Sequence, residues 1–471
     1  MINIPKLLYE AVAKEFKDYG GPWLYYLLAL YISLPLLAYY IIPTLTANPM
    51  KFTKRKSISI IVLGDLGHSP RMRYHALSLS KYEYVVNLVG YIESDIPIEI
   101  IDDPNIELYD IKMIKNQFNL PFVVFAAYKV MFQVVSIFQL LFQLKGSNYI
   151  MIQNPPSLPL LLMVVVFTKL FSRRTKLVID WHNLNYTILN LKYNNLNHPM
   201  VKFLKWYEKS LSGYADLNLT VTEQMKSFLV NEFNVESEKI ITLYDRPNER
   251  FQPQKFGNDD IQQQFPNIDM LMSGIPDNES YKIIISSTSF TPDEDFNILL
   301  DALVLYQKDM QSDRLLPPIL CVITGKGPMK DQFLSTVRQL DFDPKQIIVK
   351  NVWLDPEEYP IMISMAKLGI SLHTSSSGID LPMKIVDMFG CGVPVISLQF
   401  PAIGELVKDG VNGLITTKNN QKQDQSTQVY QLLKQALMDN NLYQTIKNGA
   451  MEETKLRWDQ NWTKCLASTF K

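Results

Sequence analysis

This sequence has few cysteines and no excess of positive or negative charge. Three cysteines occur in 471 residues, at Cys321, Cys391 and Cys465; this odd, scattered set excludes a disulfide framework and fits reduced thiols in a cytosolic setting. Basic and acidic residues number 46 and 47, for a net charge of -1, so no overall field attracts nucleic acid and no nucleic-acid partner is expected. The chain is too long for one hydrophobic core, which suggests two or three structural units.

Charge is also missing from one long stretch near the N-terminus. After a short N-terminal segment, residues 1–22, the stretch 23–45 has no charged side chain and carries Trp and Tyr toward its ends. A helix of this length crosses the ~30 Å hydrocarbon core of a bilayer, and such aromatic residues are typical of its interfaces. We therefore expect a single transmembrane anchor at 23–45. The basic residues at 51–56 favour a cytosolic location for the large C-terminal part.

Beyond this stretch, short apolar segments alternate with amphipathic helical ones. Strands are expected at 57–64, 82–91, 149–153, 176–182, 217–222 and 239–244, and again at 281–290, 319–327, 346–354, 368–375 and 393–398. Apolar strands separated by helices indicate parallel sheets covered on both faces.

This pattern predicts an α/β protein with two Rossmann-like, doubly wound domains, an N-terminal one at 57–244 and a C-terminal one at 281–445. A polar connection at 245–280 joins them, and a C-terminal helix at 446–471 follows. Such domains face each other across a cleft, with ligands at the carboxyl ends of the strands.

Two helical segments in the first half are unusually apolar. Residues 120–144 contain Lys129 as their one charge, and residues 158–171 contain Lys169. Two interpretations stay open: helices partly immersed in the membrane surface, or ordinary core helices.

The first expected strand leads into the motif VLGDLGHSPRMRYHALSL. Its candidate functional residues are Gly64, Asp65, Gly67, Arg71, Arg73 and His75. Glycines let the backbone approach a ligand closely, and the N-terminus of the following helix attracts an anion such as a phosphate. The alternative is an ordinary turn followed by a solvated basic helix face.

A second motif, VIDWHNLNYT, places Asp180, His182 and Asn183 at the end of a buried strand. A histidine here could accept a proton from a hydroxyl group, with the aspartate orienting it. The alternative is a hydrogen-bonded structural histidine.

In the second half, Ser287, Thr288 and Ser289 end one strand, and Gly325 and Lys326 end the next. Hydroxyl groups, turn amides and one cation suit a nucleotide phosphate. The alternative for the first group is a helix-capping loop.

The motif SLHTSSSGIDLPMKIVDMFGCGVPVI supplies His373, Ser376, Gly378, Asp380, Lys384 and Asp387. The spacings of four and three put Asp380, Lys384 and Asp387 on one face of the expected helix. Small-residue amides and the helix N-terminus would form an anion cradle, with Lys384 adding charge. Asp380 could instead be the helix cap.

Four of these stretches, GIDLPMKIVDMFGCGVPVI, VIDWHN, GDLGHSPRMRYHALSL and SSTSFTPDEDF, together resemble the chitobiosyldiphosphodolichol β-mannosyltransferases, a family of GT-B glycosyltransferases. The resemblance implies inverting transfer of the first mannose from GDP-mannose, in β1,4 linkage, onto GlcNAc2-diphosphodolichol in early N-glycan precursor assembly. It implies a location at the endoplasmic reticulum membrane, with the catalytic domains on the cytosolic face. Other mannosyltransferases of the pathway are implied as partners. GDP-mannose is the co-substrate, no cofactor is expected, and a divalent cation would at most stimulate.

On the same resemblance, the C-terminal domain binds the donor through residues 287–289, Gly325, Lys326, His373, Ser376, Gly378, Asp380, Lys384 and Asp387. The N-terminal domain binds the acceptor through Gly64, Gly67, Arg71, Arg73 and Asn183. Inversion implies in-line attack with one general base, for which Asp65, His75, Asp180 and His182 are the candidates. No metal site is expected, and the acidic run at 293–295 is interpreted as surface charge.

The chain departs from the usual GT-B pattern in two places. Aspartates, Asp380 and Asp387, stand where many GT-B enzymes have glutamates, and the loop at 286–296 has no cation for the diphosphate. Lys326, Lys384 and Arg246 are the alternative cations. Two other functions stay open: a membrane-anchored GT-B relative with retaining mannosyl or N-acetylglucosaminyl transfer, and a non-catalytic scaffold of this fold.

Overall fold

The computed structural model describes residues 26, 55–112, 114, 121–254, 264–273, 275, 280–291, 294–312, 315–417 and 422–470. The expected N-terminal segment and transmembrane anchor lie outside these residues, apart from Tyr26. Within the described part of the chain, no helix has the length and apolar character needed to cross a bilayer.

The N-terminal domain is built on a seven-stranded parallel sheet with the order β3-β2-β1-β4-β5-β6-β7. Its strands are β1 (Ser57–Asp65), β2 (Val85–Tyr91), β3 (Ile106–Asp110), β4 (Tyr149–Asn154), β5 (Lys176–Trp181), β6 (Leu217–Thr220) and β7 (Ile240–Thr242). The main helices are α3 (Pro70–Lys81), α4 (Ile98–Ile101), α5 (Phe122–Gln143), α6 (Leu160–Val166), α7 (Asn185–Tyr193), α8 (Pro199–Ser212) and α9 (Glu223–Phe233). Apolar clusters on both faces of the sheet bury its central strands, as their continuous apolar runs predict.

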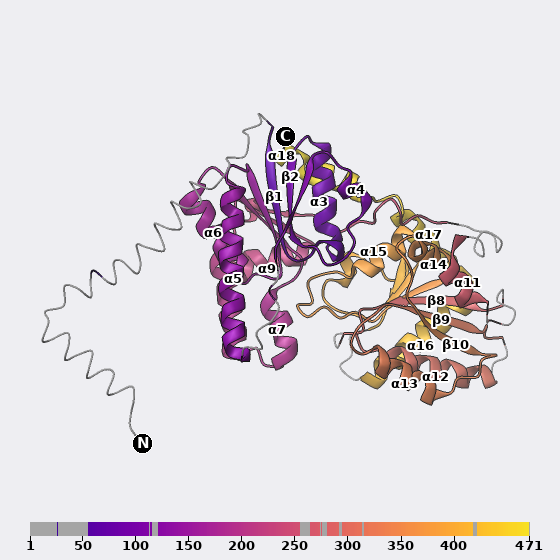
Figure 1. Cartoon of the computed structure of the whole chain (residues 1–471). Helices are drawn as coiled ribbons and strands as arrows, with labels where there is room; N and C mark the ends of the chain where they lie inside the picture. The colour runs from indigo at the N-terminus through magenta and orange to yellow at the C-terminus, as the bar shows by residue number, and fades with distance from the viewer. Residues whose placement is uncertain are drawn as a thin grey trace, which may run out of the picture.

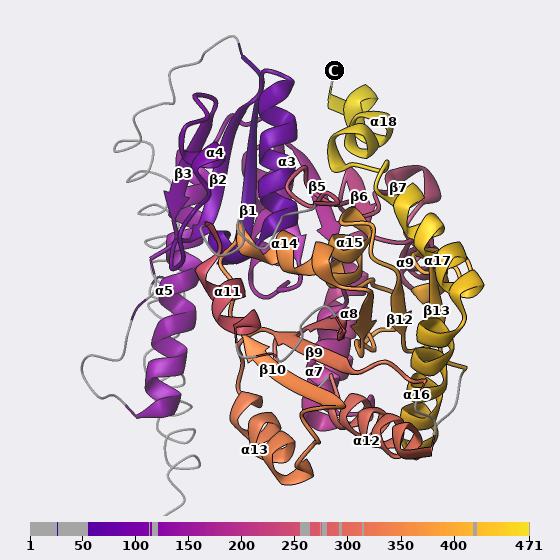
Figure 2. The ribbon, with the colours of Figure 1, turned by 90° about the vertical axis from the view of Figure 1, so that its right-hand side faces the viewer.

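The C-terminal domain repeats this plan with a six-stranded parallel sheet in the order β10-β9-β8-β11-β12-β13. Its strands are β8 (Lys282–Ser287), β9 (Ile319–Thr324), β10 (Ile347–Val352), β11 (Leu368–Ser371), β12 (Val395–Ser397) and β13 (Gly413–Ile415). The helices around it are α11 (Pro266–Met272), α12 (Asn297–Ser312), α13 (Lys330–Leu340), α14 (Glu358–Met365), α15 (Met383–Gly390), α16 (Lys422–Met438) and α17 (Asn440–Glu453). Figures 1 and 2 show the two sheets in separate lobes with α15 at the boundary. The prediction of two parallel, Rossmann-like sheets is confirmed.

Two regions differ from the sequence expectation. The expected connection at 245–280 contains α11, whose Ile268 and Leu271 are buried in the core of the C-terminal domain. The expected C-terminal helix at 446–471 is two helices, α17 and α18 (Trp458–Phe470).

The last helix, α18, returns to the N-terminal domain and packs on α3 (Figure 1). Its Trp458, Trp462 and Phe470 are buried together with residues of β1 and β2. The phenol of Tyr84 donates a 2.8 Å hydrogen bond to the carbonyl of Phe470, which fixes the end of the helix. The N-terminal domain therefore takes part of its core from the end of the chain.

The two unusually apolar segments have different environments. In α6, Leu160, Leu161 and Val164 are buried but Leu162 is 46% exposed, so contact of this helix with a membrane stays a prediction. In α5, Ile137 is buried while Met131 is 69% exposed. Contact of α5 with a membrane stays a prediction.

A buried carboxylate, Glu208 of α8, supports the start of α7. It accepts 2.9 Å hydrogen bonds from the side-chain amide of Asn154 and the backbone N–H of Asn185, and a 3.4 Å bond from the backbone N–H of Tyr186. The two backbone donors belong to the first turn of α7, where helical N–H groups lack intrahelical partners. Burial raises the pKa of Glu208 to about 7, although these donors oppose the rise.

We expect Glu208 to make stability fall as the pH rises through the acid-to-neutral range. A raised pKa means that the folded state binds the proton more tightly than the unfolded state does. The contribution is therefore full below the ordinary value of 4.5 and is lost as the pH rises to about 7. The difference corresponds to about 3 kcal/mol. In Glu208→Gln, urea unfolding across this range should lack that decline.

The matched control for this prediction is Glu232→Gln, which removes an exposed carboxylate on α9. It should keep the pH dependence of the unmodified chain. Parallel pH curves for Glu208→Gln and the unmodified chain would contradict the prediction.

Candidate active site

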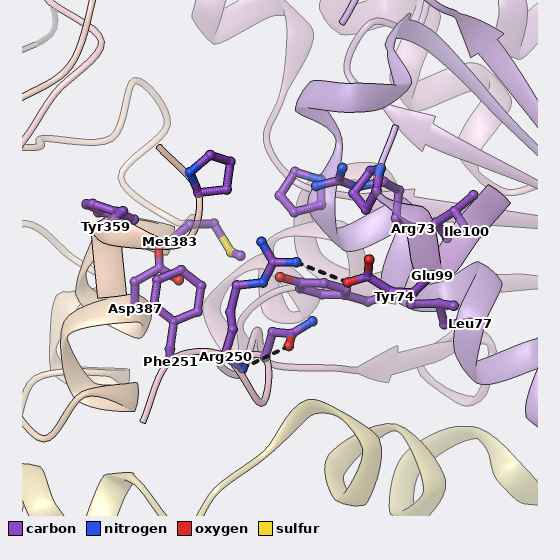
Figure 3. A pocket seen from close by; sticks show the side chains of 14 residues that line it. Arg73, Tyr74, Leu77, Glu99, Ile100, Arg250, Phe251, Tyr359, Met383 and Asp387 are labelled. Carbon is purple, nitrogen blue, oxygen red and sulfur yellow. Dashed lines mark hydrogen bonds and ion pairs between the residues drawn. The ribbon is translucent and has the colours of Figure 1, made fainter. Parts of the chain in front are cut away.

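A cavity of about 210 Å³ lies between the two domains (Figure 3). The N-terminal domain contributes α3 and α4, the C-terminal domain contributes α14 and α15, and the connection contributes the segment 248–251. The labelled lining residues are Arg73, Tyr74, Leu77, Glu99, Ile100, Arg250, Phe251, Tyr359, Met383 and Asp387. The predicted cleft therefore has walls from both domains.

An ion pair crosses this cavity. Arg250 Nη2 lies 3.0 Å from Glu99 Oε1, and the connection is thereby joined to α4 (Figure 3). Both side chains are partly exposed, so the pair contributes at most ~1 kcal/mol. Arg73 lines the same cavity, and burial together with the charge of Arg250 lowers its pKa. If Glu99 moved away from Arg250, the guanidinium groups of Arg250 and Arg73 would both be available to an anionic ligand.

Asp387 is recessed at the C-terminal wall of the cavity, on α15. Burial and the nearby charge of Asp245 raise its pKa well above the usual range, while Arg250 opposes the rise. A carboxyl group held in this way can exchange hydrogen bonds with ligand hydroxyl groups. The end of α15 is fixed by Gly390, because a Cβ there would lie 2.6 Å from Pro247 Cβ and 2.9 Å from Phe251 Cβ.

Asp380 lies before α15, in the loop that follows β11. Pro382 precedes the first helical residue, and the residue before a proline is disfavoured in helical conformation. The helix-face prediction for Asp380, Lys384 and Asp387 is therefore wrong, and Asp380 is not the cap either, because the N-cap position is Pro382. Asp380 instead accepts hydrogen bonds from the hydroxyls of Ser375 and Ser377.

The other predicted residues of this loop surround Asp380. His373 Nε2 lies 3.7 Å from Asp380 Oδ2. Gly378 has φ +75°, a left-handed conformation that glycine adopts without strain, and its carbonyl accepts a 3.0 Å bond from Ala402 N–H. The loop is therefore held by internal hydrogen bonds.

Glu294 is the centre of the polar network beside this loop. Its Oε2 accepts a 2.6 Å hydrogen bond from the Thr288 hydroxyl and a 3.3 Å bond from Ser289 N–H, and its Oε1 lies 2.6 Å from Lys384 Nζ. Interpreting Glu294 as surface charge is wrong, since the residue is 6% exposed. The network fixes Lys384, at the start of α15, against the loop after β8.

The loops after β8 and β9 pack backbone against backbone. A Cβ on Gly325, whose φ is +147°, would lie 1.9 Å from the Thr288 carbonyl oxygen, so only glycine fits. The side chain of Lys326 extends over the ring of Trp353, with Nζ 3.9 Å from the ring centroid. Ser287 is buried, and its Oγ accepts hydrogen bonds from Thr324 and Tyr359, so this hydroxyl belongs to an internal network.

Beneath the N-terminal wall, Arg71 and Asp180 form a buried ion pair. The guanidinium donates two hydrogen bonds to the carboxylate, at 2.8 and 2.9 Å, and a third, at 2.7 Å, to Asp245. Burial alone would raise the pKa of Asp180, but Arg71 and His182 outweigh it and hold the pKa well below the usual range. Asp180 is therefore an ionised carboxylate with both oxygens engaged.

Two histidines face this carboxylate. His75 is fully buried: Trp462 Nε1–H donates to its Nδ1 at 3.0 Å, and its Nε2 lies 3.3 Å from Asp180 Oδ2. His182 is 24% exposed, and its Nε2 lies 2.8 Å from the same Asp180 oxygen. The structure thus brings His75, Asp180 and His182 together. Because His75 and Asp180 are 0% exposed, neither touches the cleft, and their prediction as substrate-contacting bases does not fit their positions.

The contacts of Asp65 also indicate a structural role, in holding two loops together. Its carboxylate accepts hydrogen bonds from the N–H groups of Gly67, Glu93 and Ser94, and it lies 2.6 Å from His68 Nδ1. Burial would raise its pKa, but these donors hold the pKa below its usual range. A Cβ on Gly67 would lie 2.7 Å from Ser94 Cβ, so this glycine serves loop packing, whereas Gly64 has ordinary space around it.

Contacts between the domains hold the loop at 374–382 from the N-terminal side. Asn183 Nδ2 donates to Ser376 Oγ at 3.2 Å, and the Thr222 hydroxyl donates to the Ile379 carbonyl at 2.5 Å. Glu405 accepts 2.8 and 2.9 Å bonds from the backbone N–H groups of Glu223 and Gln224, which begin α9. A carboxylate from one domain therefore caps a helix of the other.

Sequence reasoning missed several residues that line the cavity or join the domains: Tyr74, Glu99, Arg250, Glu294 and Glu405. Arg250 lies four residues after Arg246, which the sequence had suggested as a cation, but Arg246 lies 3.4 Å from Glu453 and not in the cavity lining. In the described part of the chain, no cluster of three or more His, Cys, Asp or Glu side chains could hold a metal ion.

Comparisons with known proteins identify the family. The family model for glycosyl transferases group 1 matches residues 269–450. A protein of Debaryomyces hansenii named chitobiosyldiphosphodolichol beta-mannosyltransferase is 54% identical over 98% of this chain and 98% of its own length. Proteins of the same name from Candida albicans and Homo sapiens are 56% and 33% identical, over 96% and 86% of this chain and 96% and 91% of their own lengths.

Solved structures show the same fold at low identity. Sucrose-phosphate synthase from Thermosynechococcus elongatus has a TM-score of 0.64 at 13% identity, covering 88% of this chain and 98% of that chain. Anabaena HepE in complex with UDP and glucose has a TM-score of 0.60 at 15% identity, covering 88% and 99%. The chain is thus a glycosyltransferase of GT-B fold, and it belongs to the chitobiosyldiphosphodolichol β-mannosyltransferase family.

Proposed function

We propose that this chain transfers the first mannose from GDP-mannose, in β1,4 linkage and with inversion, onto GlcNAc2-diphosphodolichol. The observation that carries the proposal is the near full-length identity, 54% over 98% of both chains, with a protein of that name. The shared name of the relatives does not favour a retaining transferase or a non-catalytic scaffold. Residues 23–45 would anchor the chain in the endoplasmic reticulum membrane, with the two domains on the cytosolic side. Other mannosyltransferases of the pathway are proposed as partners on the sequence resemblance alone.

We assign the donor to the C-terminal wall of the cleft. Asp387 is suited to hydroxyl groups of the nucleoside or the sugar, because it is recessed in the cavity and its pKa is raised. Lys384 and the first N–H groups of α15 are suited to the diphosphate, since a cation and a helix N-terminus both favour an anion. Glu294 holds Lys384 in that place.

The diphosphate carries more negative charge than Lys384 alone offsets. Arg250 and Arg73 line the cavity into which Asp387 is recessed, so they are the additional cations that this geometry favours over Arg246. Lys326, with its ammonium group over Trp353, is suited to the edge of the nucleotide site. The proposal requires no cofactor, since GDP-mannose is a co-substrate. A divalent cation would bind together with the diphosphate.

His182 is the general base that the geometry favours. Asp180 engages Nε2 of His182, which leaves Nδ1 as the nitrogen with a lone pair. As the acceptor oxygen attacks C1 of mannose from the face opposite the diphosphate, its proton passes to His182, and the departing GDP takes the bonding electrons. His75 and Arg71 orient Asp180 from below.

We expect His182→Ala to lower kcat by about 10²- to 10⁴-fold, the usual contribution of a general base. Because the His182 side chain is 24% exposed and is assigned no contact with the donor, the melting temperature and the KM for GDP-mannose should change little. The measurement is steady-state transfer to a short-chain diphosphate chitobiose acceptor, with His198→Ala as the matched histidine control. A variant that keeps more than half of the kcat would exclude His182 as the base.

The structural counterpart of that variant is Asp180→Asn. It leaves the buried guanidinium of Arg71 with less charge compensation, which should cost about 3–5 kcal/mol of unfolding free energy. Urea unfolding separates the two effects: His182→Ala loses rate without stability, whereas Asp180→Asn loses both.

We expect Lys384→Met to weaken GDP binding by about 10- to 100-fold, because a charged hydrogen bond to the diphosphate is lost. Glu294→Gln should weaken binding less, since it loosens Lys384 without removing it. Titration of GDP, with UDP for comparison, by calorimetry or thermal shift measures both. Lys308→Met, on the exposed side of α12, is the matched control. Unchanged GDP affinity in Lys384→Met would remove this residue from the donor site.

A further inference from the structure

The two helices that follow β5, α7 and α8, carry an exposed apolar surface, which we call the α7–α8 face. It consists of Ile188, Leu191, Leu196, Met200, Phe203 and Trp206. Leu191 is 56% exposed, Leu196 is 60% exposed and Trp206 is 62% exposed. These are large side chains gathered within two helices and their connection, unlike the isolated exposed apolar residues of most surfaces.

Two adjoining stripes of α8 are apolar. Val201, Leu204 and Tyr207 face the core, which is enough to hold the helix in place. Met200, Phe203 and Trp206 each precede one of these core residues by one position, so they lie about 100° around the helix from them, and they are exposed. The rings of Phe203 and Trp206 lie 6.0 Å apart, so they form one aromatic patch. Core packing therefore does not explain the outer residues.

Lysines outnumber exposed carboxylates around this face. Lys192, Lys202 and Lys209 are exposed. Between residues 183 and 212 the sequence has a single carboxylate, Glu208, which is fully buried under α7. One exposed acid lies beside the face, Glu232 of α9, and it pairs with Lys205 of α8 at 3.2 Å. Exposed aromatic and aliphatic side chains edged by an excess of lysines are complementary to the headgroup and upper acyl region of an anionic bilayer.

The face is also close to the cleft. Asn183, which contacts Ser376 across the cleft, lies two residues before the start of α7. The helix extends only ~14 Å from that point, at about 1.5 Å per residue. Figures 1 and 2 show α7 and the partly exposed helix α5 at the same, lower end of the N-terminal domain. A bilayer along this end would be near the place where a lipid-borne acceptor must enter.

We propose that the α7–α8 face docks on the surface of an anionic phospholipid bilayer and thereby sets the height of the cleft above it. This inference rests on the proposed function in one respect, the lipid-borne acceptor that gives the docking its purpose. Aromatic rings lie among the headgroups, lysines contact anionic phosphates, and the diphosphate of the acceptor stays at the level of the cleft.

The test places a nitroxide spin label at position 206 of the full chain, through Trp206→Cys, with Cys465→Ser removing the one cysteine that is not buried. The matched control is Met270→Cys in the C-terminal domain, where the native side chain is 67% exposed. In nanodiscs containing phosphatidylserine, accessibility to oxygen should rise and accessibility to a water-soluble nickel chelate should fall at 206 but not at 270. A label at 206 that remains as accessible to nickel as the one at 270 overturns the proposal.

Other occupants of the face give a different result. A second copy of the chain, or the chain's own N-terminal segment, would shield position 206 in detergent as well as in nanodiscs, and that outcome also overturns the proposal. Local labels are needed because the expected anchor would hold the full chain on any membrane.

A second measurement uses activity. The triple variant Lys192→Glu, Lys202→Glu and Lys209→Glu should transfer mannose to a long-chain acceptor in anionic vesicles about 10-fold more slowly or worse. Transfer to a short-chain acceptor in detergent should be unchanged. Equal rates on vesicles contradict docking, whereas absence of transfer to either acceptor by the unmodified chain contradicts the proposed function and leaves the labelling result intact.

Discussion

The buried pair of Arg71 and Asp180 is the interaction on which the N-terminal half of the site depends. Arg71 comes from α3, Asp180 from β5, and the same guanidinium donates to the Leu243 carbonyl and to Asp245 at the start of the connection. One charged group therefore joins a helix, the centre of the sheet and the segment that leads to the other domain. A buried pair of this kind is costly to break, because the remaining charge has no water to compensate it.

The same pair determines what the neighbouring histidines can do. Its carboxylate engages Nε2 of His182, the general base that we propose, while His75 is closed in by Trp462 from the last helix. On the opposite wall, Glu294 has the same relation to Lys384. In both domains a buried carboxylate thus positions a partly exposed basic side chain. Contacts between the domains at Ser376, Ile379 and Glu405 bring the two walls together.

Most of the fold could be predicted because the buried strands are continuous apolar runs. The strands β3 and β13 could not, since both lie at sheet edges: β3 includes the polar Glu107 and Asp110, and β13 has three residues. Individual site residues were recognisable as polar groups after strands. Their pairings were not, because Arg71 and Asp180 are 109 residues apart. Local spacing also misled at Asp380, where Pro382 starts the helix later than the pattern suggested.

The return of α18 to the first domain has a consequence for biosynthesis. The ribosome releases the strands of the N-terminal sheet long before Trp458, Trp462 and Phe470, yet these rings fill the core around β1 and β2. Until they arrive, the nascent domain has an open apolar face on its sheet. We therefore expect that half to mature only after α18 has been synthesised, and removal of α18 to destabilise the part of the protein that was made first.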